Sequence, residues 1–202
     1  MDIELNFVNH SNDANNSDIV IFQKNAATDD FPVAWLVIRN CGPGDNHPFN
    51  YPVAMAVSAG DRWGNDTPWL PGQDGQMFAV TRAGEGAALA YAGPSADPAT
   101  VQVRNDLADS AIVARLHKEG RVAAIVAGLA PQQIAAFRLA PTIWIGVAAR
   151  ATEGELLNAG AVADVAEISL IGFVSADIVM TGGGPGPDAP PFTFALANVV
   201  IA

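Results

Sequence analysis

Short apolar segments, separated by clusters of glycine, proline, asparagine and aspartate, run through the whole sequence. Apolar and polar residues alternate at residues 2–8, and continuous apolar runs occupy residues 19–22 and 33–38. Alternation with a period of two is typical of half-buried strands, and short uninterrupted apolar runs are typical of interior strands. The breaker clusters recur at roughly the 8–12-residue interval of sandwiches and barrels. The pattern therefore predicts an all-β fold.

The predicted architecture is an antiparallel β-sandwich, either immunoglobulin-like or jelly-roll-like. With 202 residues, 50 % of them hydrophobic, the chain can bury the core of one large or two small domains. The 19 glycines and 14 prolines suit tight turns and argue against a helical bundle. The cluster Gly93–Pro98 is the best boundary. We expect a first β unit with elaborated loops at residues 1–95 and a second at 96–202, or else one continuous sandwich over 1–202.

A faint internal repeat suggests that a β unit is duplicated. Arg39-Asn40, at the end of one predicted strand, recurs as Arg104-Asn105 at the end of another. Each pair precedes a loop, a strand and a charged turn. In this alignment the first copy differs from the second by long loops at residues 41–52 and 60–76. The alternative is chance, because strand–turn–strand patterns resemble one another in any β protein.

Several local features lead to separate expectations. Residues 2–8 and 19–22 are expected to form a hairpin-like opening with a long polar loop. The segments Gly84-Glu85-Gly86 and Lys118-Glu119-Gly120 are expected to be hairpin turns, because glycine tolerates the positive φ that such turns require. Residues 152–164 are expected to form either a short helix or a loop.

The net charge of −11 and the pI of about 4.4 argue against a nucleic-acid partner and against an anionic membrane surface. The acidic residues are spread along the chain, which favours a role in solubility; an acidic cation-binding face is the alternative. No apolar run approaches the ~20 residues of a membrane span, and the N-terminus does not resemble a signal peptide. We expect a soluble cytoplasmic protein, and export by a route without a signal peptide stays open.

The usual catalytic and cofactor motifs are absent from the sequence, so no cofactor is expected. Cys41 is the single cysteine, and His47 lies close by; with Asp45 they suggest a zinc site or a thiolate nucleophile. The local spacing supplies too few ligands, so we expect no metal there and a buried Cys41. Residues 9–18 are rich in oxygen donors but lack calcium-loop spacing. We expect that loop to be stabilised by its own Asx turns.

Two tryptophans in a polar neighbourhood form the best candidate ligand site. Trp63 and Trp69 lie among Asp61, Asn65 and Asp66. An aromatic ring can stack on the apolar face of a sugar while fixed amides and carboxylates bind its hydroxyls. The alternative is that both indoles cover the open end of a sandwich.

The final predicted strand, residues 192–201, follows a Gly/Pro-rich link and carries few charges. It can pair within its own chain or add to the open edge of a neighbouring copy. Together with the low charge density, this strand favours a homo-oligomer. We therefore expect a non-catalytic, soluble binding or self-assembling protein. The alternatives are a lectin-like carbohydrate-binding protein and, third, a hydrolase that uses a pair of carboxylates.

Overall fold

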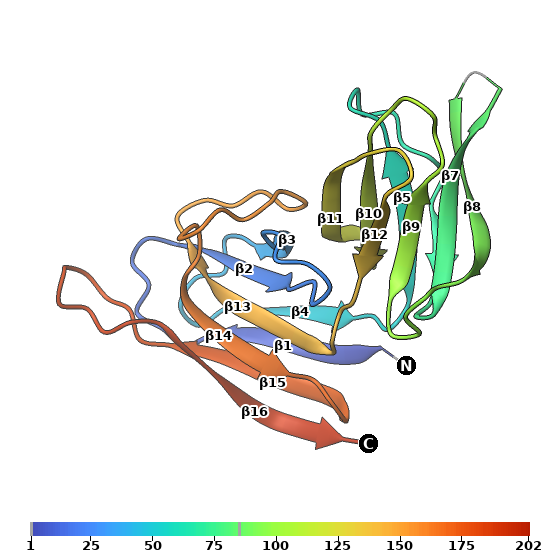
Figure 1. The fold of residues 1–202 in the computed structure, drawn as a ribbon. Coiled ribbons are helices and arrows are strands. Elements are labelled where there is room, and N and C mark those ends of the chain that lie inside the picture. Colours follow the sequence, from blue (N-terminus) through green and yellow to red (C-terminus); the bar gives the residue numbers. More distant parts are fainter. Residues whose placement is uncertain (1, 85) are drawn as a thin grey trace. The chain divides into compact units, whose positions relative to one another are not determined.

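The computed structural model describes residues 2–84 and 86–202, and this part of the chain is all β (Figure 1). It contains sixteen strands and no helix that could cross a membrane. In chain order the strands are β1 (Ile3–Asn9), β2 (Asp18–Gln23), β3 (Val33–Ile38), β4 (Asn46–Tyr51), β5 (Met55–Gly60), β6 (Leu70–Gly72), β7 (Gln76–Ala83), β8 (Gly86–Pro94), β9 (Val101–Asn105), β10 (Ile112–Lys118), β11 (Arg121–Leu129), β12 (Ile134–Phe137), β13 (Thr142–Ala148), β14 (Ala163–Ser169), β15 (Phe173–Thr181) and β16 (Thr193–Ile201).

The chain forms two compact units, each with two four-stranded sheets. Unit 1 comprises the chain up to Gln23, Val33–Val53 and Pro141–Ala202, and unit 2 comprises Lys24–Pro32 and Ala54–Ala140. The strands of unit 2 therefore lie between the two halves of unit 1 in the sequence. This division does not follow the expected boundary between residues 95 and 96.

In unit 1 the sheets have the orders β16-β15-β1-β4 and β14-β13-β2-β3. β1 runs parallel to β15 and antiparallel to β4. Phe7, Trp35 and Ile178 are fully buried in this unit, and the Trp35 ring meets Tyr51 edge-on at 6.0 Å between centroids. The expectation of a hairpin-like opening is wrong: β1 and β2 lie in different sheets, because β1 takes its partners from β4 and the distant β15.

In unit 2 the sheets have the orders β11-β10-β5-β6 and β12-β9-β7-β8. One core joins them, with Val57 and Leu116 from the first sheet against Phe78, Val103 and Phe137 from the second. β7 precedes the Gly93–Pro98 cluster in the sequence and β9 follows it, and the two strands pair in parallel. The strands on either side of that cluster therefore belong to one sheet. The antiparallel sandwich predicted from the sequence is confirmed, with one parallel pair in each unit among the described residues.

The two segments expected as long loops both contain a strand. Residues 41–52 include β4, and residues 60–76 include β6. β4 is mostly polar, so it lacks the apolar pattern of a strand; only Phe49 and Tyr51 reach the buried Trp35, in edge-on contacts. Its pairing with β1, rather than its own composition, makes it a strand.

The predictions for the two hairpins agree with the structure. β10 and β11 pair antiparallel through Glu119 and Gly120, both at positive φ (50° and 76°), as expected for a tight hairpin. β7 and β8 also form the expected hairpin, although Glu85 at its turn lies outside the described residues. Residues 152–162 are loop and turn, and the strand β14 begins at Ala163.

Candidate functional site

The loop that joins β5 to β6 in unit 2 holds all five residues of the predicted ligand site, and Asp61 organises it. The Asp61 carboxylate accepts hydrogen bonds from the backbone N–H groups of Trp63 (2.8 Å) and Asn65 (3.0 Å) and from the Asn65 side-chain amide (2.8 Å). Gly64 between them has a φ of 87°. The bonds from the Asn65 side chain, and then from its backbone, lower the pKa of Asp61. Asp61 is therefore ionised at neutral pH and largely occupied within its own loop.

Asp66 closes the loop through contacts with a neighbouring strand. Its carboxylate pairs with Arg115 of β10 at 2.5 Å. A Cβ atom at Gly60 would lie 1.9 Å from the Asp66 carboxylate, so a larger residue there would displace the side chains of this ion pair. Thr67 and Ala59 exchange two hydrogen bonds of 2.8 and 3.1 Å, which return the chain toward β6. The loop is thus fixed at both ends.

A pocket of about 370 Å³ opens beside this loop. Asp61, Asn65 and Asp66 line one part of it, and Gly86 and Ser110 line another. Three of the five predicted residues are therefore brought together around one hollow. Small and apolar residues such as Leu107 and Ile112 complete the lining, so the pocket combines an apolar wall with a few polar groups, as ligand sites commonly do.

The two tryptophans do not line this pocket, and each contacts a side chain of its own chain. Trp63 is 75 % exposed, and the guanidinium of Arg62 lies 4.5 Å from its ring centroid. Trp69 stacks on His117 with 3.9 Å between ring centroids and keeps 47 % of its surface exposed. Trp63 is thus an exposed surface aromatic, whereas Trp69 partly covers His117 of β10.

A contact that sequence analysis missed lies beneath Trp69. Ser58 of β5 and His117 of β10 are buried, with 2.8 Å between the serine Oγ and the histidine Nε2. Burial, and then the charge of Arg115, lower the pKa of His117 to about 4, although Asp66 acts in the opposite direction. A serine–histidine contact resembles a nucleophile and its base, but a buried serine cannot reach a substrate. Only the β5–β10 pairing brings the two together, so no sequence signal could have identified them.

Cys41 and His47, the pair considered and set aside as a zinc or nucleophile site, lie in the loop before β4 and on β4 itself. Cys41 is buried, and burial, followed by the charge of Asp45, raises the pKa of its thiol. A raised pKa disfavours the thiolate that metal binding or nucleophilic attack requires. His47 is an exposed residue of β4. Within residues 2–84 and 86–202, no three His, Cys, Asp or Glu side chains gather in a metal-binding arrangement.

The oxygen-rich loop between β1 and β2 is stabilised by its own side chains, as predicted. The Asn9 side chain accepts a hydrogen bond from the backbone of Ser11 at 2.9 Å. The Asp13 carboxylate accepts bonds from the backbone N–H groups of Asn15 (2.9 Å) and Ser17 (2.7 Å). These are Asx-type turns, and they use the oxygens that a calcium ion would need.

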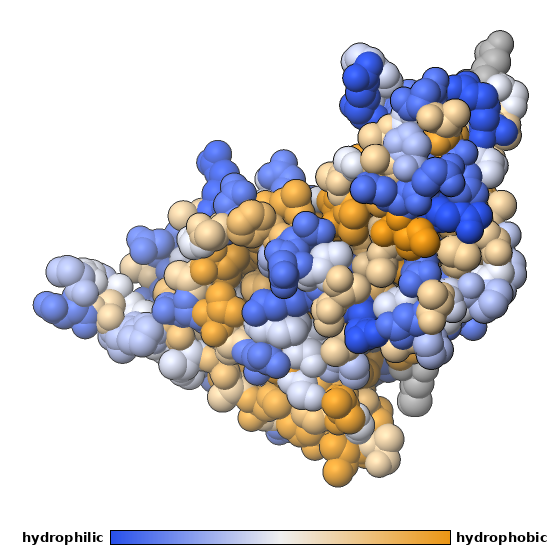
Figure 2. Space-filling model, viewed as in Figure 1, coloured by the Kyte–Doolittle hydropathy of each residue, from blue (hydrophilic) through white to orange (hydrophobic). Residues whose placement is uncertain are grey.

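β16 forms an outer edge of unit 1 and pairs with β15 of its own chain. Its nine residues carry no charged side chain. Four apolar side chains on it are exposed: Leu196 at 40 %, Val199 at 42 %, Val200 at 51 % and Ile201 at 70 %. Figure 2 shows hydrophobic residues gathered near the C-terminal end of β16. Such an edge presents unpaired backbone groups together with apolar surface.

The other edges of unit 1 are protected in ways that natural sheets commonly use. β14 carries Asp164 and Glu167, and β4 contains Pro48, which has no N–H to donate. The segment that precedes β14 covers β3, because the N–H of Ala34 donates a hydrogen bond to the Glu155 carbonyl at 2.9 Å. β16 is therefore the long edge of unit 1 without a charge, a proline or a covering segment in the described residues, although its register with β15 shifts around Asn198, which has a φ of 50°.

Comparisons with protein-family models, curated proteins and solved structures find no match. A functional conclusion for this chain therefore depends on its own geometry. Two features carry such a conclusion: the charge-free edge strand β16 in unit 1 and the pocket beside the Asp61–Trp69 loop in unit 2.

Proposed function

We propose that the protein is a non-catalytic, self-associating structural protein and that a second copy adds a strand to the sheet at β16. The observation that carries the proposal is a nine-residue outer strand with no charged residue and four exposed apolar side chains. Proteins that remain monomeric usually block such strands with lysine, proline or a bulge. β16 has no lysine and no proline, and its register shift around Asn198 leaves Thr193–Ala197 in regular pairing with β15. Strand addition supplies backbone hydrogen bonds for affinity and side-chain contacts for selectivity.

The energetics favour a contact that uses both backbone and side chains. Full burial of Val199, Val200 and Ile201 contributes up to about 1.5–3 kcal/mol each. Association costs an estimated 4–15 kcal/mol in lost translational and rotational freedom. The side chains alone therefore offset this cost only in part, and the backbone bonds along β16 are needed for a stable contact.

Unit 2 carries an edge of the same kind. β8 is an outer strand of nine residues without a charged side chain, and its Tyr91 is 59 % exposed. It differs from β16 in ending at a proline, Pro94, and its register with β7 shifts near Gly93. One such edge in each unit gives the chain two places at which a copy can add. If β16 of one molecule pairs with β8 of the next, the contact is heterologous and can continue beyond a dimer.

The test is a pair of matched lysine substitutions on the outer strands of unit 1. Val200→Lys places a charge on β16, and Val165→Lys places one at a similarly exposed valine on β14 (51 % and 45 % exposed). We expect Val200→Lys to weaken self-association at least tenfold in sedimentation velocity, while Val165→Lys leaves it unchanged. A wild-type chain that is monomeric at all concentrations, or an equal loss in both variants, would contradict the proposal.

Carbohydrate binding is the second candidate, favoured by the pocket between Asp61, Asn65 and Asp66 with the exposed Trp63 on the same loop. The ionised Asp61 supports hydrogen bonding to hydroxyl groups. The test is a glycan array: a signal that Trp63→Ala abolishes supports this candidate, and no signal from the wild type ends it. The carboxylate-pair hydrolase finds less support, because the lowered pKa of Asp61 is the reverse of what a general acid needs.

A further inference from the structure

The two units have the same strand order when the first eight strands are matched with the last eight. Unit 1 has β16-β15-β1-β4 and β14-β13-β2-β3; in unit 2 the same positions are taken by β8-β7-β9-β12 and β6-β5-β10-β11. Each strand of unit 1 thus corresponds to the strand of unit 2 whose number differs from its own by eight. The parallel pair is matched as well, because β1 with β15 corresponds to β9 with β7.

In unit 1 the junction after β1 is built around the buried Asn9. Its backbone N–H donates to the Asp45 carbonyl at 2.9 Å, and its carbonyl accepts from Gly44 at 2.7 Å. Its side-chain amide donates to the Cys41 carbonyl at 2.7 Å, and its side-chain oxygen accepts from the Ser11 N–H at 2.9 Å. Asn9 therefore joins the end of β1 to the loop before β4.

In unit 2 the junction after β9 repeats these four bonds around the buried Asn105. Its backbone N–H donates to the Gln133 carbonyl at 3.0 Å, and its carbonyl accepts from Gln132 at 2.7 Å. Its side-chain amide donates to the Leu129 carbonyl at 2.8 Å, and its side-chain oxygen accepts from the Leu107 N–H at 3.0 Å. Apart from the asparagine, the residue types differ between the junctions, so shared geometry rather than shared composition relates them.

The connections in the middle of each set of eight strands explain why its first four strands do not fold against its last four. β4 leads to β5 through Pro52–Ala54, and β12 leads to β13 through Arg138–Pro141. Each connection is short and leaves one unit for the other. Each contains a proline, which holds the preceding residue extended and opposes a reversal of the chain.

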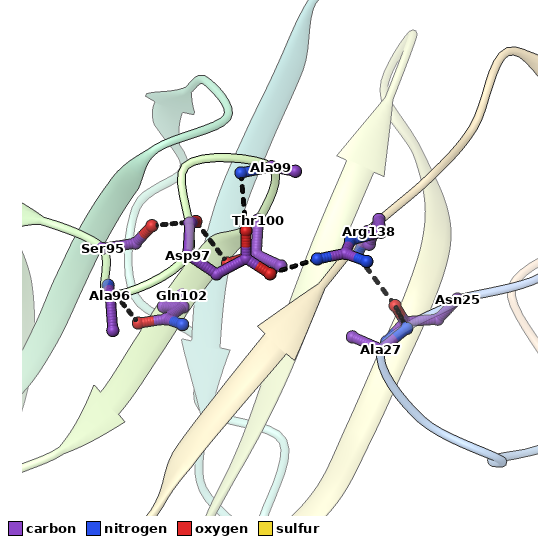
Figure 3. Close-up of polar contacts among 9 residues, drawn as sticks. All are labelled: Asn25, Ala27, Ser95, Ala96, Asp97, Ala99, Thr100, Gln102 and Arg138. Carbon is purple, nitrogen blue, oxygen red and sulfur yellow. Dashed lines mark hydrogen bonds and ion pairs between the residues drawn. The ribbon is translucent and has the colours of Figure 1, made fainter.

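Unit 1 shows the place at which strands β1–β4 could have continued directly into β5–β8 within one unit. The Gln23 amide donates to the Tyr51 hydroxyl at 2.8 Å and to the Thr142 carbonyl at 3.2 Å. The end of β4 therefore lies beside the beginning of β13, which is the strand that matches β5. In unit 2 the start of the second connection is anchored: Arg138 pairs with Asp97, and its N–H donates to Asn25 at 2.8 Å (Figure 3).

We propose that the chain is a tandem duplication of residues 1–95 and 96–202, that the two repeats exchange halves within one molecule, and that a second copy of the chain can supply the same halves. Each unit then contains four strands of each repeat. Exchange between molecules remakes the same contacts, so it needs no new interface. This association uses the sandwich interiors and is independent of the proposed strand addition at β16.

The first test cuts the folded full-length protein between the repeats, at a protease site inserted after Ser95. We expect the two pieces to remain a one-to-one complex at the size of the uncut chain, and to unfold together when they are diluted far enough to separate. Recovery of two separate pieces that each keep a cooperative β-sheet melting transition would overturn the exchange.

The second test asks whether a second copy can supply the halves. Two full-length versions with different tags are unfolded in urea, mixed and refolded at about 1 µM and at about 1 mM, since linked partners compete at effective concentrations near the millimolar range. We expect doubly tagged species to form at the higher concentration and to persist on dilution, with and without Val200→Lys. Their absence at both concentrations would overturn this part. The β16 proposal is judged separately, by the effect of Val200→Lys and Val165→Lys on association of chains that have not been unfolded.

Discussion

Unit 1 and unit 2 have the same strand order but expose different surfaces. Unit 1 ends in the charge-free edge strand β16, whereas unit 2 carries the polar Asp61–Trp69 loop with the buried His117 beneath it. What the units share is internal: the pairing of the central strands and the junctions at Asn9 and Asn105. The comparison teaches that one internal framework supports two surfaces, and that function is to be sought in an outer strand and a loop.

The largest expected effect concerns the shared asparagine junctions. Asn9→Ala and Asn105→Ala each leave buried backbone groups without partners, so each should destabilise its own unit by about 2–4 kcal/mol. Hydrogen exchange resolved by segment should show Asn9→Ala acting on unit 1 and Asn105→Ala on unit 2. The exposed Asn158→Ala is the control and should change neither. If either substitution raised hydrogen exchange equally in both units, the claim that each junction stabilises its own unit would be contradicted.

A difference in acid sensitivity should follow, since His117 belongs to unit 2. Its folded-state pKa of about 4 lies below its ordinary value of 6.5. Between these values the unfolded chain binds a proton that the folded chain does not, so stability present above pH 6.5 falls as the pH drops. The expected loss is up to about 1.4 kcal/mol per pH unit. Urea unfolding at pH 7, 6 and 5 checks this, and His117→Gln should flatten the dependence. An unchanged slope in that variant would exclude His117 as the cause.

The smallest effect separates the two tryptophans of the loop. Trp69→Ala removes the ring stacked on His117 and should cost about 1–2 kcal/mol of stability. Trp63→Ala removes a ring that is 75 % exposed and should cost less than about 0.5 kcal/mol. Thermal melts of both variants check this. Equal losses would mean that Trp63 supports the fold as well, which would weaken its assignment to a ligand surface.

Most strands of this protein could be predicted from the sequence, but their partners could not. Alternation in β1 and the apolar run of β3 reflect burial that each segment experiences directly, so the pattern predicted both. β4 was missed because its residues are mostly polar and its pairing with β1 makes it a strand. The parallel pairing of β1 with β15 depends on contacts from opposite ends of the chain, which no local pattern encodes.

The repeat and the candidate site show the same limit. The sequence suggested a duplication through Arg39-Asn40 and Arg104-Asn105, but the structural counterpart of Asn105 is Asn9, because hydrogen bonds rather than neighbouring letters define it. At the site, Asp61 and Asn65 are close in sequence and could be grouped by composition. The contact between Ser58 and His117 depends on the register of β5 against β10, which a single sequence does not specify.

Self-association at β16 is tested most directly by hydrogen exchange at its backbone amides over a range of protein concentrations. Strand addition predicts that the amides facing away from β15 become protected as the concentration rises. Those of β14, the charged outer strand of the other sheet in unit 1, should exchange at a constant rate. Protection on β16 that is independent of concentration, or that rises equally on β14, would contradict the account.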